Sequence, residues 1–393
     1  MRGSSTTYMN KRPGFNEVYS GNAVKKHQYY DWSLVLIVIF LLVIGILMLY
    51  SASYYAATKY YHDPMLNVRK QITFALIGLV FMIIISRFDY HLLIKPFPAF
   101  KKINLIRLGY ILCLVLQVAV LFASAVSGSE RWIEIGPIKF QPSELTKILV
   151  LIYSAYFAYA FSSKAIGKLP GIIYICIILG PLILLVAFEN LSTGIIIFAI
   201  MFTVCFIASK NKYWWFLMLF AGGIAGAIFI KAEKYRMDRF KTWLNFETDP
   251  KGYQIRQGLY AIASGGFWGK GFGQGTQKLG YIVEAHTDYI FTIVCEELGF
   301  IGALAVIVTF VLLLWRMYII AVSAPDRFGA FLCVGVMVHI AVQVLLNIAV
   351  ATNTIPSTGV TLPFFSYGGT SLFLLLCEIG LVLSVSNSIS VRY

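Results

Sequence analysis

The sequence predicts an all-α protein that crosses a membrane many times. Of its 393 residues, 59% are hydrophobic and only 13% are charged, and the mean hydropathy is +0.77. A water-soluble domain of this size could not cover such a composition with a polar surface. The apolar residues also recur in runs long enough to cross a bilayer as helices, and about ten such helices are expected.

The chain begins with a polar, basic segment that holds no short apolar stretch with a small-residue cleavage site. We expect residues 1–32 to be a cytoplasmic N-terminal tail and residues 33–391 to be a single transmembrane domain. The expected spans are 33–54, 71–86, 106–126, 145–161, 170–188, 191–208, 213–231, 288–321, 327–351 and 367–391.

The distribution of Lys and Arg predicts the orientation of these spans. An even number of spans places both termini on one side, and the short segments on that side carry more basic residues than those opposite. By the positive-inside rule both termini are cytoplasmic, and segment 232–287 forms a large extracytoplasmic loop between helices 7 and 8. The net charge of +14 is dispersed over loop ends without a basic-aromatic module, so no nucleic acid is expected as a partner.

The cysteines predict neither a disulfide framework nor a metal site. All six fall inside apolar runs rather than in loops, where they are expected to be small core residues: Cys113, Cys176, Cys205, Cys295, Cys333 and Cys377.

The junction at Asp288 is the strongest candidate site. His286 and Asp288 end the long polar loop, and Glu296 and Glu297 lie inside the apolar run that follows. A charged group at membrane depth costs about 3 kcal/mol on insertion scales, so such a cluster is a functional candidate. The alternative is that Thr287 or Asp288 caps the helix and that Glu296 or Glu297 forms a buried pair.

Three other outer segments carry unusual polar sequence. Glu144 and Lys147 lie on one face of the fourth span. They could belong to a functional site or form an ordinary ion pair at the membrane interface. The glycine-rich loop around Lys270 could cradle phosphate, although it lacks the ending of a Walker A loop, or it could be a flexible surface loop. Prolines and glycines between 351 and 371 predict non-helical backbone that lines a cavity.

Polar residues in the ninth span point towards the same place. Gln343 and Asn347 lie four residues apart and therefore share a helix face. They could serve the cavity or form hydrogen bonds between helices.

These segments together resemble the shape, elongation, division and sporulation (SEDS) family, and its FtsW/SpoVE branch more than its RodA branch. The matching motifs are Arg131-Trp132-Ile133, Gln141-Pro142-Ser143-Glu144 with Lys147, Tyr253-Gln254 with Gln257-Gly258, Gly269-Lys270-Gly271, Glu284-Ala285-His286-Thr287-Asp288 with Glu296-Glu297, and Pro356 through Gly369. The resemblance implies a ten-span peptidoglycan glycosyltransferase of the bacterial cytoplasmic (inner) membrane, acting in cell division or sporulation. Its substrate would be lipid II, polymerised at the outer face with inversion at the anomeric carbon and release of undecaprenyl pyrophosphate.

The same resemblance assigns roles to residues. Asp288 matches the family's catalytic aspartate, and Glu296, Glu297, Gln343 and Asn347 are expected to hold helices together or to tune the site. The expected substrate-binding residues are Arg131, Trp132, Glu144, Lys147, Gln254, Gln257, Lys270, His286, Pro356, Thr358, Ser366, Tyr367, Gly368 and Gly369. A divalent cation such as Mg or Mn could assist at the pyrophosphate, although the sequence shows no dedicated ligand set.

One motif departs from the family pattern. Residues 189–194 read Glu-Asn-Leu-Ser-Thr-Gly, without a carboxylate that many relatives carry, so no role is transferred to this stretch.

The family also implies partners, namely a class B penicillin-binding transpeptidase and other division proteins. The sequence shows no Ser-x-x-Lys transpeptidase site in an outer soluble domain, so cross-linking would come from such a partner. Two other functions stay open from the sequence, a lipid II flippase and a non-catalytic division scaffold. Both predict that glycan polymerisation does not depend on Asp288.

Overall fold

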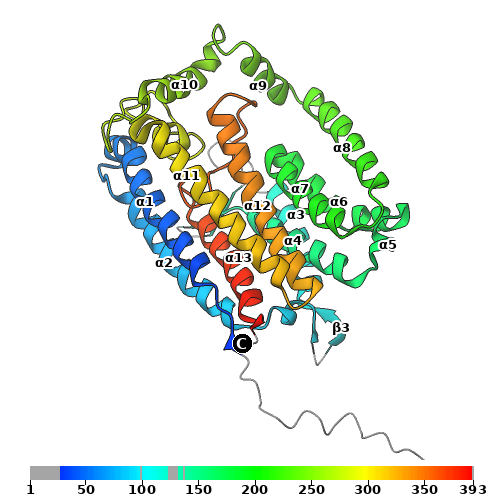
Figure 1. The fold of residues 1–393 in the computed structure, drawn as a ribbon. Helices are drawn as coiled ribbons and strands as arrows, with labels where there is room; N and C mark the ends of the chain where they lie inside the picture. The colour runs from blue at the N-terminus through cyan, green and yellow to red at the C-terminus, as the bar shows by residue number, and fades with distance from the viewer. Residues whose placement is uncertain (1–26, 98–99, 123–131, 136–137, 392–393) are drawn as a thin grey trace, which may run out of the picture.

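The apolar runs form long helices that stand side by side in the computed structural model (Figure 1). The structure describes residues 27–97, 100–122, 132–135 and 138–391. Its long helices are α1 (Trp32–Tyr61), α2 (Leu66–Arg87), α3 (Leu105–Leu121), α4 (Pro142–Ala160), α6 (Leu169–Glu189), α7 (Leu191–Ala208), α8 (Tyr213–Ala232), α11 (Ile290–Ser323), α12 (Arg327–Ala351) and α13 (Gly369–Asn387).

In the described part of the chain, eight helices are long and apolar enough to cross a membrane, namely α1, α2, α6, α7, α8, α11, α12 and α13. The expected all-α, multi-pass architecture is therefore confirmed. Helix α3 is shorter, at 17 residues, and α4 begins with a polar turn that contains Glu144 and Lys147. The expectation of about ten spans stays a prediction.

Helix boundaries differ from the expected ones where polar residues continue a helix. Helix α1 starts at Trp32 rather than at residue 33, because the side chain of Asp31 caps it by accepting a hydrogen bond from Leu34 N at 2.9 Å. It then continues to Tyr61, well beyond residue 54, through residues that are compatible with a helix but not apolar. Hydropathy alone does not detect such extensions.

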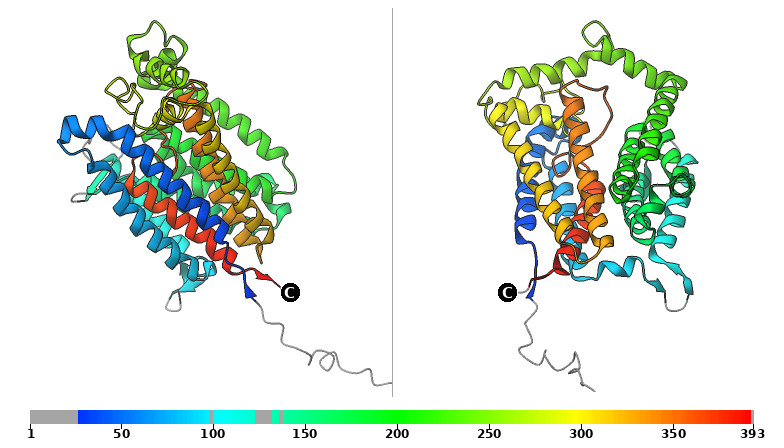
Figure 2. Two further views of the ribbon diagram at one scale, coloured as in Figure 1. Left: turned by 60° about the vertical axis from the view of Figure 1, so that its left-hand side comes forward. Right: turned by 45° about the vertical axis from the view of Figure 1, so that its right-hand side comes forward.

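The segment 232–287 is not a simple loop. It contains α9 (Lys234–Leu244), the 3-10 turn η2 (Pro250–Gly252) and α10 (Tyr253–Gly265). Helix α9 runs across one end of the bundle between α8 and α10 (Figure 2). Regular structure therefore covers the end of the bundle where the candidate site lies.

The remaining elements are short. Helix α5 (Ser163–Ile166) joins α4 to α6, and three antiparallel strand pairs occur in the described residues. They are β1 (His27–Gln28) with β6 (Ser390–Val391), β2 (Pro96–Phe97) with β3 (Phe100–Asn104), and β4 (Ile133–Ile135) with β5 (Ile138–Phe140). The β1–β6 pair places both described ends of the chain at the end of the bundle opposite α9 (Figure 1).

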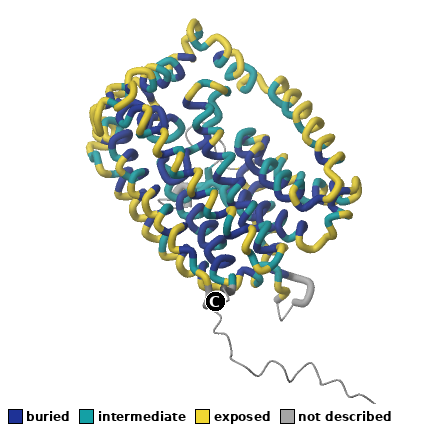
Figure 3. The backbone as a smooth tube through the Cα atoms, viewed as in Figure 1, coloured by how far each residue is buried: buried dark blue, intermediate teal, exposed yellow. Residues whose placement is uncertain are grey.

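Helix α12 lies at the centre of the packing. It contacts α4, α7, α11 and α13, while α13 packs along α2, and α1 packs against α2 and α11. Helix α8 stands at the edge, where Trp215 alone among its residues is buried (Figure 3). Most of its other apolar side chains are exposed, as expected for a helix in contact with lipid.

The connection 352–368 between α12 and α13 is non-helical, and its second part, from 360 to 366, is mostly buried in protein. A Cβ atom on Gly45 of α1 would lie 2.3 Å from the carbonyl oxygen of Phe364, so only a glycine permits this close approach. Irregular backbone is tolerated at membrane depth when protein surrounds it in this way.

Candidate active site

A cavity of about 320 Å³ opens beside Asp288 at the end of the bundle that α9 and α10 cover. Four segments line it: α9, the start of α10, the residues before α11, and the connection after α12. Its lining residues are Tyr235, Asp238, Arg239, Thr242, Lys251, Gln254, Ile255, Glu284, Asp288, Tyr289, Ser357 and Gly359. The volume lies at the lower end of the range of ligand sites.

The backbone around Asp288 is fixed from two sides. The side-chain amide of Asn347 on α12 donates to the carbonyl oxygen of Asp288 at 2.9 Å and to that of Val360 at 2.8 Å. Ser366 Oγ donates to the carbonyl oxygen of Thr287 at 2.6 Å. Asn347 and Ser366 therefore position the catalytic candidate through its main chain.

The carboxylate of Asp288 is half-buried and lies against Gly359, where an added Cβ atom would be 3.5 Å from Oδ2. Burial, together with the negative charge of Asp288, raises the pKa of the neighbouring Tyr289 phenol to about 12. Tyr289 is therefore a neutral hydrogen-bond donor across the physiological pH range.

Arg239 provides positive charge in the same cavity. Its guanidinium donates to the carbonyl oxygen of Ser357 at 3.2 Å and lies 4.6 Å from the centre of the Tyr235 ring. Lys251 lines the cavity too, 3.4 Å from Asp238, and both side chains of this pair are exposed. An Arg and a Lys beside a carboxylate suit a phosphorylated substrate.

His286 does not add to this positive charge. Burial lowers its pKa, so the imidazole is neutral at pH 7, and Nδ1 is buried with no hydrogen-bond partner among the described residues. Its backbone carbonyl oxygen accepts a hydrogen bond from the N–H group of Tyr367 at 2.8 Å.

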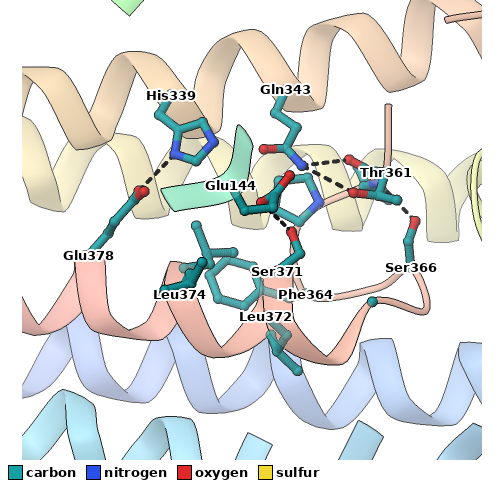
Figure 4. Close-up of a pocket in the computed structure, with 14 residues that line it drawn as sticks. Glu144, His339, Gln343, Thr361, Phe364, Ser366, Ser371, Leu372, Leu374 and Glu378 are labelled. Atoms are coloured by element: carbon teal, nitrogen blue, oxygen red, sulfur yellow. Dashed lines mark hydrogen bonds and ion pairs between the residues drawn. The ribbon is translucent and has the colours of Figure 1, made fainter. Parts of the chain in front are cut away.

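A second polar cluster lies apart from the Asp288 cavity (Figure 4). Lys147 Nζ is 2.9 Å from Glu144 Oε2, and these side chains are 3% and 13% exposed. Ser371 Oγ also donates to Glu144 at 2.7 Å, and His339 Nδ1 lies 2.7 Å from Glu378. Figure 4 shows Glu144 between this His–Glu pair and Gln343.

Lys147 is thus paired inside the bundle and does not line the cavity of Asp288. Gln343 is similarly engaged, because its amide donates to the carbonyl oxygen of Thr361 at 3.0 Å. The two clusters share no lining residue, but the connection 352–368 forms a wall of both. Side chains of α12 hold that connection in place.

The expectation that the glycine-rich loop cradles phosphate needs correction. Lys270 Nζ lies 2.7 Å from Glu296, and the loop's N–H groups at Gly273 and Thr276 donate to Glu297 and Glu296 at 3.0 and 2.9 Å. The loop therefore binds the protein's own carboxylates. Lys270 is not among the residues that line the cavity.

Most other expected substrate-binding residues hold backbone rather than line the cavity. Of that set Gln254 lines it, and Thr358 lies between two lining residues with its hydroxyl buried and without a partner among the described atoms. Gly368 N–H donates to Gln71 at 3.3 Å, and a Cβ atom on Gly369 would lie 2.2 Å from the Phe74 ring.

Four further expected residues stay outside the cavity or outside the described residues. Gln257 and Pro356 are half-buried beside the cavity but do not line it. Trp132 is half-buried just before β4. Arg131 lies outside the described residues.

Sequence reasoning did not assign Arg239, Tyr235 or Glu284 to the site. The signal was present in the basic and aromatic stretch that forms α9, but only the fold brings this helix over Asp288. Among the described residues, no group of three or more His, Cys, Asp or Glu side chains is arranged to hold a metal ion.

Comparison with known proteins decides the family. The family described as "Cell cycle protein", that of FtsW, RodA and SpoVE, matches residues 32–390. This chain belongs to the FtsW/RodA/SpoVE family.

Relatives in this family match nearly the whole chain. A probable peptidoglycan glycosyltransferase FtsW from Trichlorobacter lovleyi is 36% identical over 367 residues, covering 91% of this chain and 93% of the relative. Stage V sporulation protein E from Bacillus subtilis is also 36% identical, over 362 residues, covering 91% of this chain and 97% of the relative.

Solved structures of the family share the fold. A chain from a structure titled "Structural coordination of polymerization and crosslinking by a peptidoglycan synthase complex" superposes with a TM-score of 0.74 at 26% identity, covering 91% of this chain and 97% of that one. The rod shape determining protein RodA of Thermus thermophilus has a TM-score of 0.66 at 26% identity, covering 93% of this chain and 98% of that one.

Residues 189–194, where the sequence departs from the pattern of the FtsW/RodA/SpoVE family, connect α6 to α7. Asn190 caps α7, its side chain accepting hydrogen bonds from Ser192 N at 3.1 Å and Thr193 N at 3.4 Å. Arg236 of α9 covers the end of the preceding helix by donating to the carbonyl oxygen of Phe188 at 2.8 Å. The stretch thus forms a capped turn between α6 and α7.

Proposed function

We propose that this protein is a peptidoglycan glycosyltransferase that polymerises lipid II, with Asp288 as the general base. The observation that carries the proposal is the placement of Asp288 in a cavity with Arg239 and Lys251. The names of the relatives and the structural neighbour's title support the reaction class.

The reaction joins an acceptor sugar hydroxyl to the anomeric carbon of a lipid-linked chain. Asp288 accepts the hydroxyl proton as the new C–O bond forms, and the bond between that carbon and the pyrophosphate oxygen breaks with inversion. Glycosidases need a second carboxyl group to protonate a poor leaving group. Pyrophosphate leaves without such an acid, so one base and nearby cations suffice.

The cations of the cavity would stabilise the leaving group. Arg239 presents a planar guanidinium suited to bidentate contact, and Lys251 adds a point charge. The resemblance also allows a divalent cation at the pyrophosphate, but no group of three or more His, Cys, Asp or Glu side chains in the described residues is arranged to hold one. No step of the proposed reaction depends on such an ion.

The proposed setting is the bacterial cytoplasmic membrane, with both termini in the cytoplasm and the Asp288 cavity on the outer side. This arrangement would let the undecaprenyl chain stay in lipid while the sugars and peptide enter the cavity from water. The proposed partners are a class B penicillin-binding transpeptidase, which would cross-link the strands, and other division proteins.

Purified protein with lipid II tests the proposal. Asp288→Asn should lower the rate of glycan-strand formation about 10² to 10⁴-fold, because the isosteric amide cannot accept the proton. Asp63→Asn, which removes an exposed carboxylate paired with Arg69, is the matched control and should keep the wild-type rate.

Each variant is assayed with and without a transpeptidase partner, and folding is followed by thermal unfolding and gel filtration. Wild-type strand synthesis by Asp288→Asn would rule out Asp288 as the base and favour the flippase or scaffold. Liposomes loaded with labelled lipid II then test the flippase directly.

A further inference from the structure

Helix α11 is two helices joined at a break. Gly299 has φ +68° and ψ −167°, which interrupts the helical backbone. Residues 290–297 are all buried, whereas buried and exposed residues alternate with helical spacing after the break. The outer half-helix, 290–298, is therefore enclosed by protein, and Asp288 lies immediately before it.

The glycine-rich loop fills the break. The N–H groups of Lys270 and Gly271 donate to the carbonyl oxygens of Glu296 and Glu297, each at 3.0 Å, and Phe300 N donates to Gly266 O at 3.0 Å. These bonds satisfy backbone groups that the interrupted helix leaves without partners.

Glycine is required on both sides of the contact. Gly269 and Gly299 have positive φ values of 83° and 68°. A Cβ atom on Gly299 would lie 2.2 Å from Gly269 N, and one on Gly269 would lie 2.2 Å from Glu297 O. A side chain at either position would push the loop and the outer half-helix apart, so their backbones can approach this closely only with glycine at both.

Two ion pairs hold the same contact together, and the second is the more deeply buried. Glu296 pairs with Lys270, and Glu297 accepts from Lys278 Nζ at 2.5 Å and from Ser51 Oγ at 2.6 Å. Lys278 Nζ is also 2.6 Å from Ser51 Oγ, so the second pair reaches across to α1. The side chains of Lys278 and Glu297 are 6% and 0% exposed.

Such a pair is a rigid connection. Removing one partner leaves an uncompensated buried charge, so the native arrangement is favoured strongly over any displaced one. Asn347 holds the opposite end of the half-helix by donating to the carbonyl oxygen of Asp288. The ion pairs and this hydrogen bond together fix the position of Asp288 relative to α1 and α12.

We propose that Glu296, Glu297, Lys270 and Lys278 are positioning residues, which fix the outer half-helix and hold the Asp288 carboxylate at its reacting distance. This inference rests on the proposed role of Asp288 as the general base. A displacement of about 1 Å at a reacting group can cost roughly a hundredfold in rate without any loss of substrate binding.

The test is steady-state polymerisation of lipid II by the full-length protein. Lys278→Gln should lower kcat about tenfold to a hundredfold while leaving KM nearly unchanged. Lys278→Arg keeps the charge and should recover most of kcat. Lys95→Gln, which removes an exposed Lys paired with Asp89 near the chain ends, is the matched control and should behave as wild type.

Lys270→Gln keeps the inference testable if Lys278→Gln does not fold. This pair is less buried, with Lys270 30% exposed, so a smaller loss confined to kcat is expected. An unchanged kcat, or a loss that appears only in KM, in a folded variant would overturn the inference. If Asp288→Asn is inactive while Lys278→Gln is normal, only the positioning role fails; if Asp288→Asn is active, the proposed function itself fails.

Discussion

At the scale of the residue, the candidate site combines Asp288, which the sequence singles out, with residues such as Arg239, which it does not. Asp288 stands out because a carboxylate ends a polar loop directly before an apolar helix. Arg239 does not stand out, since it is one of several basic residues in an amphipathic helix. Its importance comes from a contact with Ser357, 118 residues away in sequence.

Arg239 should therefore matter more than its neighbours in α9. Arg239→Gln is expected to lower kcat/KM for polymerisation by about tenfold to a hundredfold, or roughly 1.4 to 2.8 kcal/mol of transition-state stabilisation. Arg239→Lys should recover only part of this loss, because an ammonium cannot bind bidentately. The control Arg69→Gln alters an exposed ion pair of the α1–α2 connection and should be neutral. A normal kcat/KM for Arg239→Gln would remove Arg239 from the site.

At the scale of the element, α11 is the helix that hydropathy describes least well. The sequence predicts a single span over 288–321, although Glu296, Glu297 and Gly299 lie inside its apolar run. The break at Gly299 arises because the loop at 266–271 forms the hydrogen bonds that a continuous helix would form internally. Glycine permits this conformation, but the partner loop makes it favourable.

Two glycine substitutions distinguish the requirement for glycine at the break in α11 from the general effect of glycine on helix stability. Gly299→Ala should destabilise the protein by more than about 1 kcal/mol, because φ is positive and the methyl group would clash with Gly269 N. Gly223→Ala in α8 meets open space and should stabilise the helix by up to about 1 kcal/mol. Thermal unfolding in detergent measures both. Equal changes in stability for the two variants would contradict the prediction that the backbone break requires glycine at position 299.

At the scale of the whole molecule, the described ends of the chain and the candidate site lie at opposite ends of the bundle. Strands β1 and β6 pair at one end, and α9 and α10 cover the cavity at the other (Figure 1). The predicted even number of spans would place both termini on one side of the membrane. By the positive-inside rule, the excess of Lys and Arg expected on that side would then place the cavity at the outer face, as proposed.

Cysteine labelling tests this orientation. In a cysteine-free background, Glu247→Cys in the connection between α9 and α10 should react with a membrane-impermeant maleimide in sealed spheroplasts. Lys95→Cys, whose position is exposed near the chain ends, should react only after permeabilisation. The reverse pattern would place the Asp288 cavity in the cytoplasm and contradict the proposed function.

The sequence by itself determined the fold class and predicted the approximate spans, and it pointed to Asp288 as the candidate general base. Hydropathy and short motifs are local properties, so they can be read without knowing which segments meet. Tertiary structure alone decided the rest: Arg239 joins the cavity, Lys147 pairs with Glu144, and the glycine-rich loop binds Glu296 and Glu297. Each of these depends on segments distant in sequence. A lysine or an exposed N–H group serves phosphate and carboxylate equally well, and only the nearest partner in the fold distinguishes them.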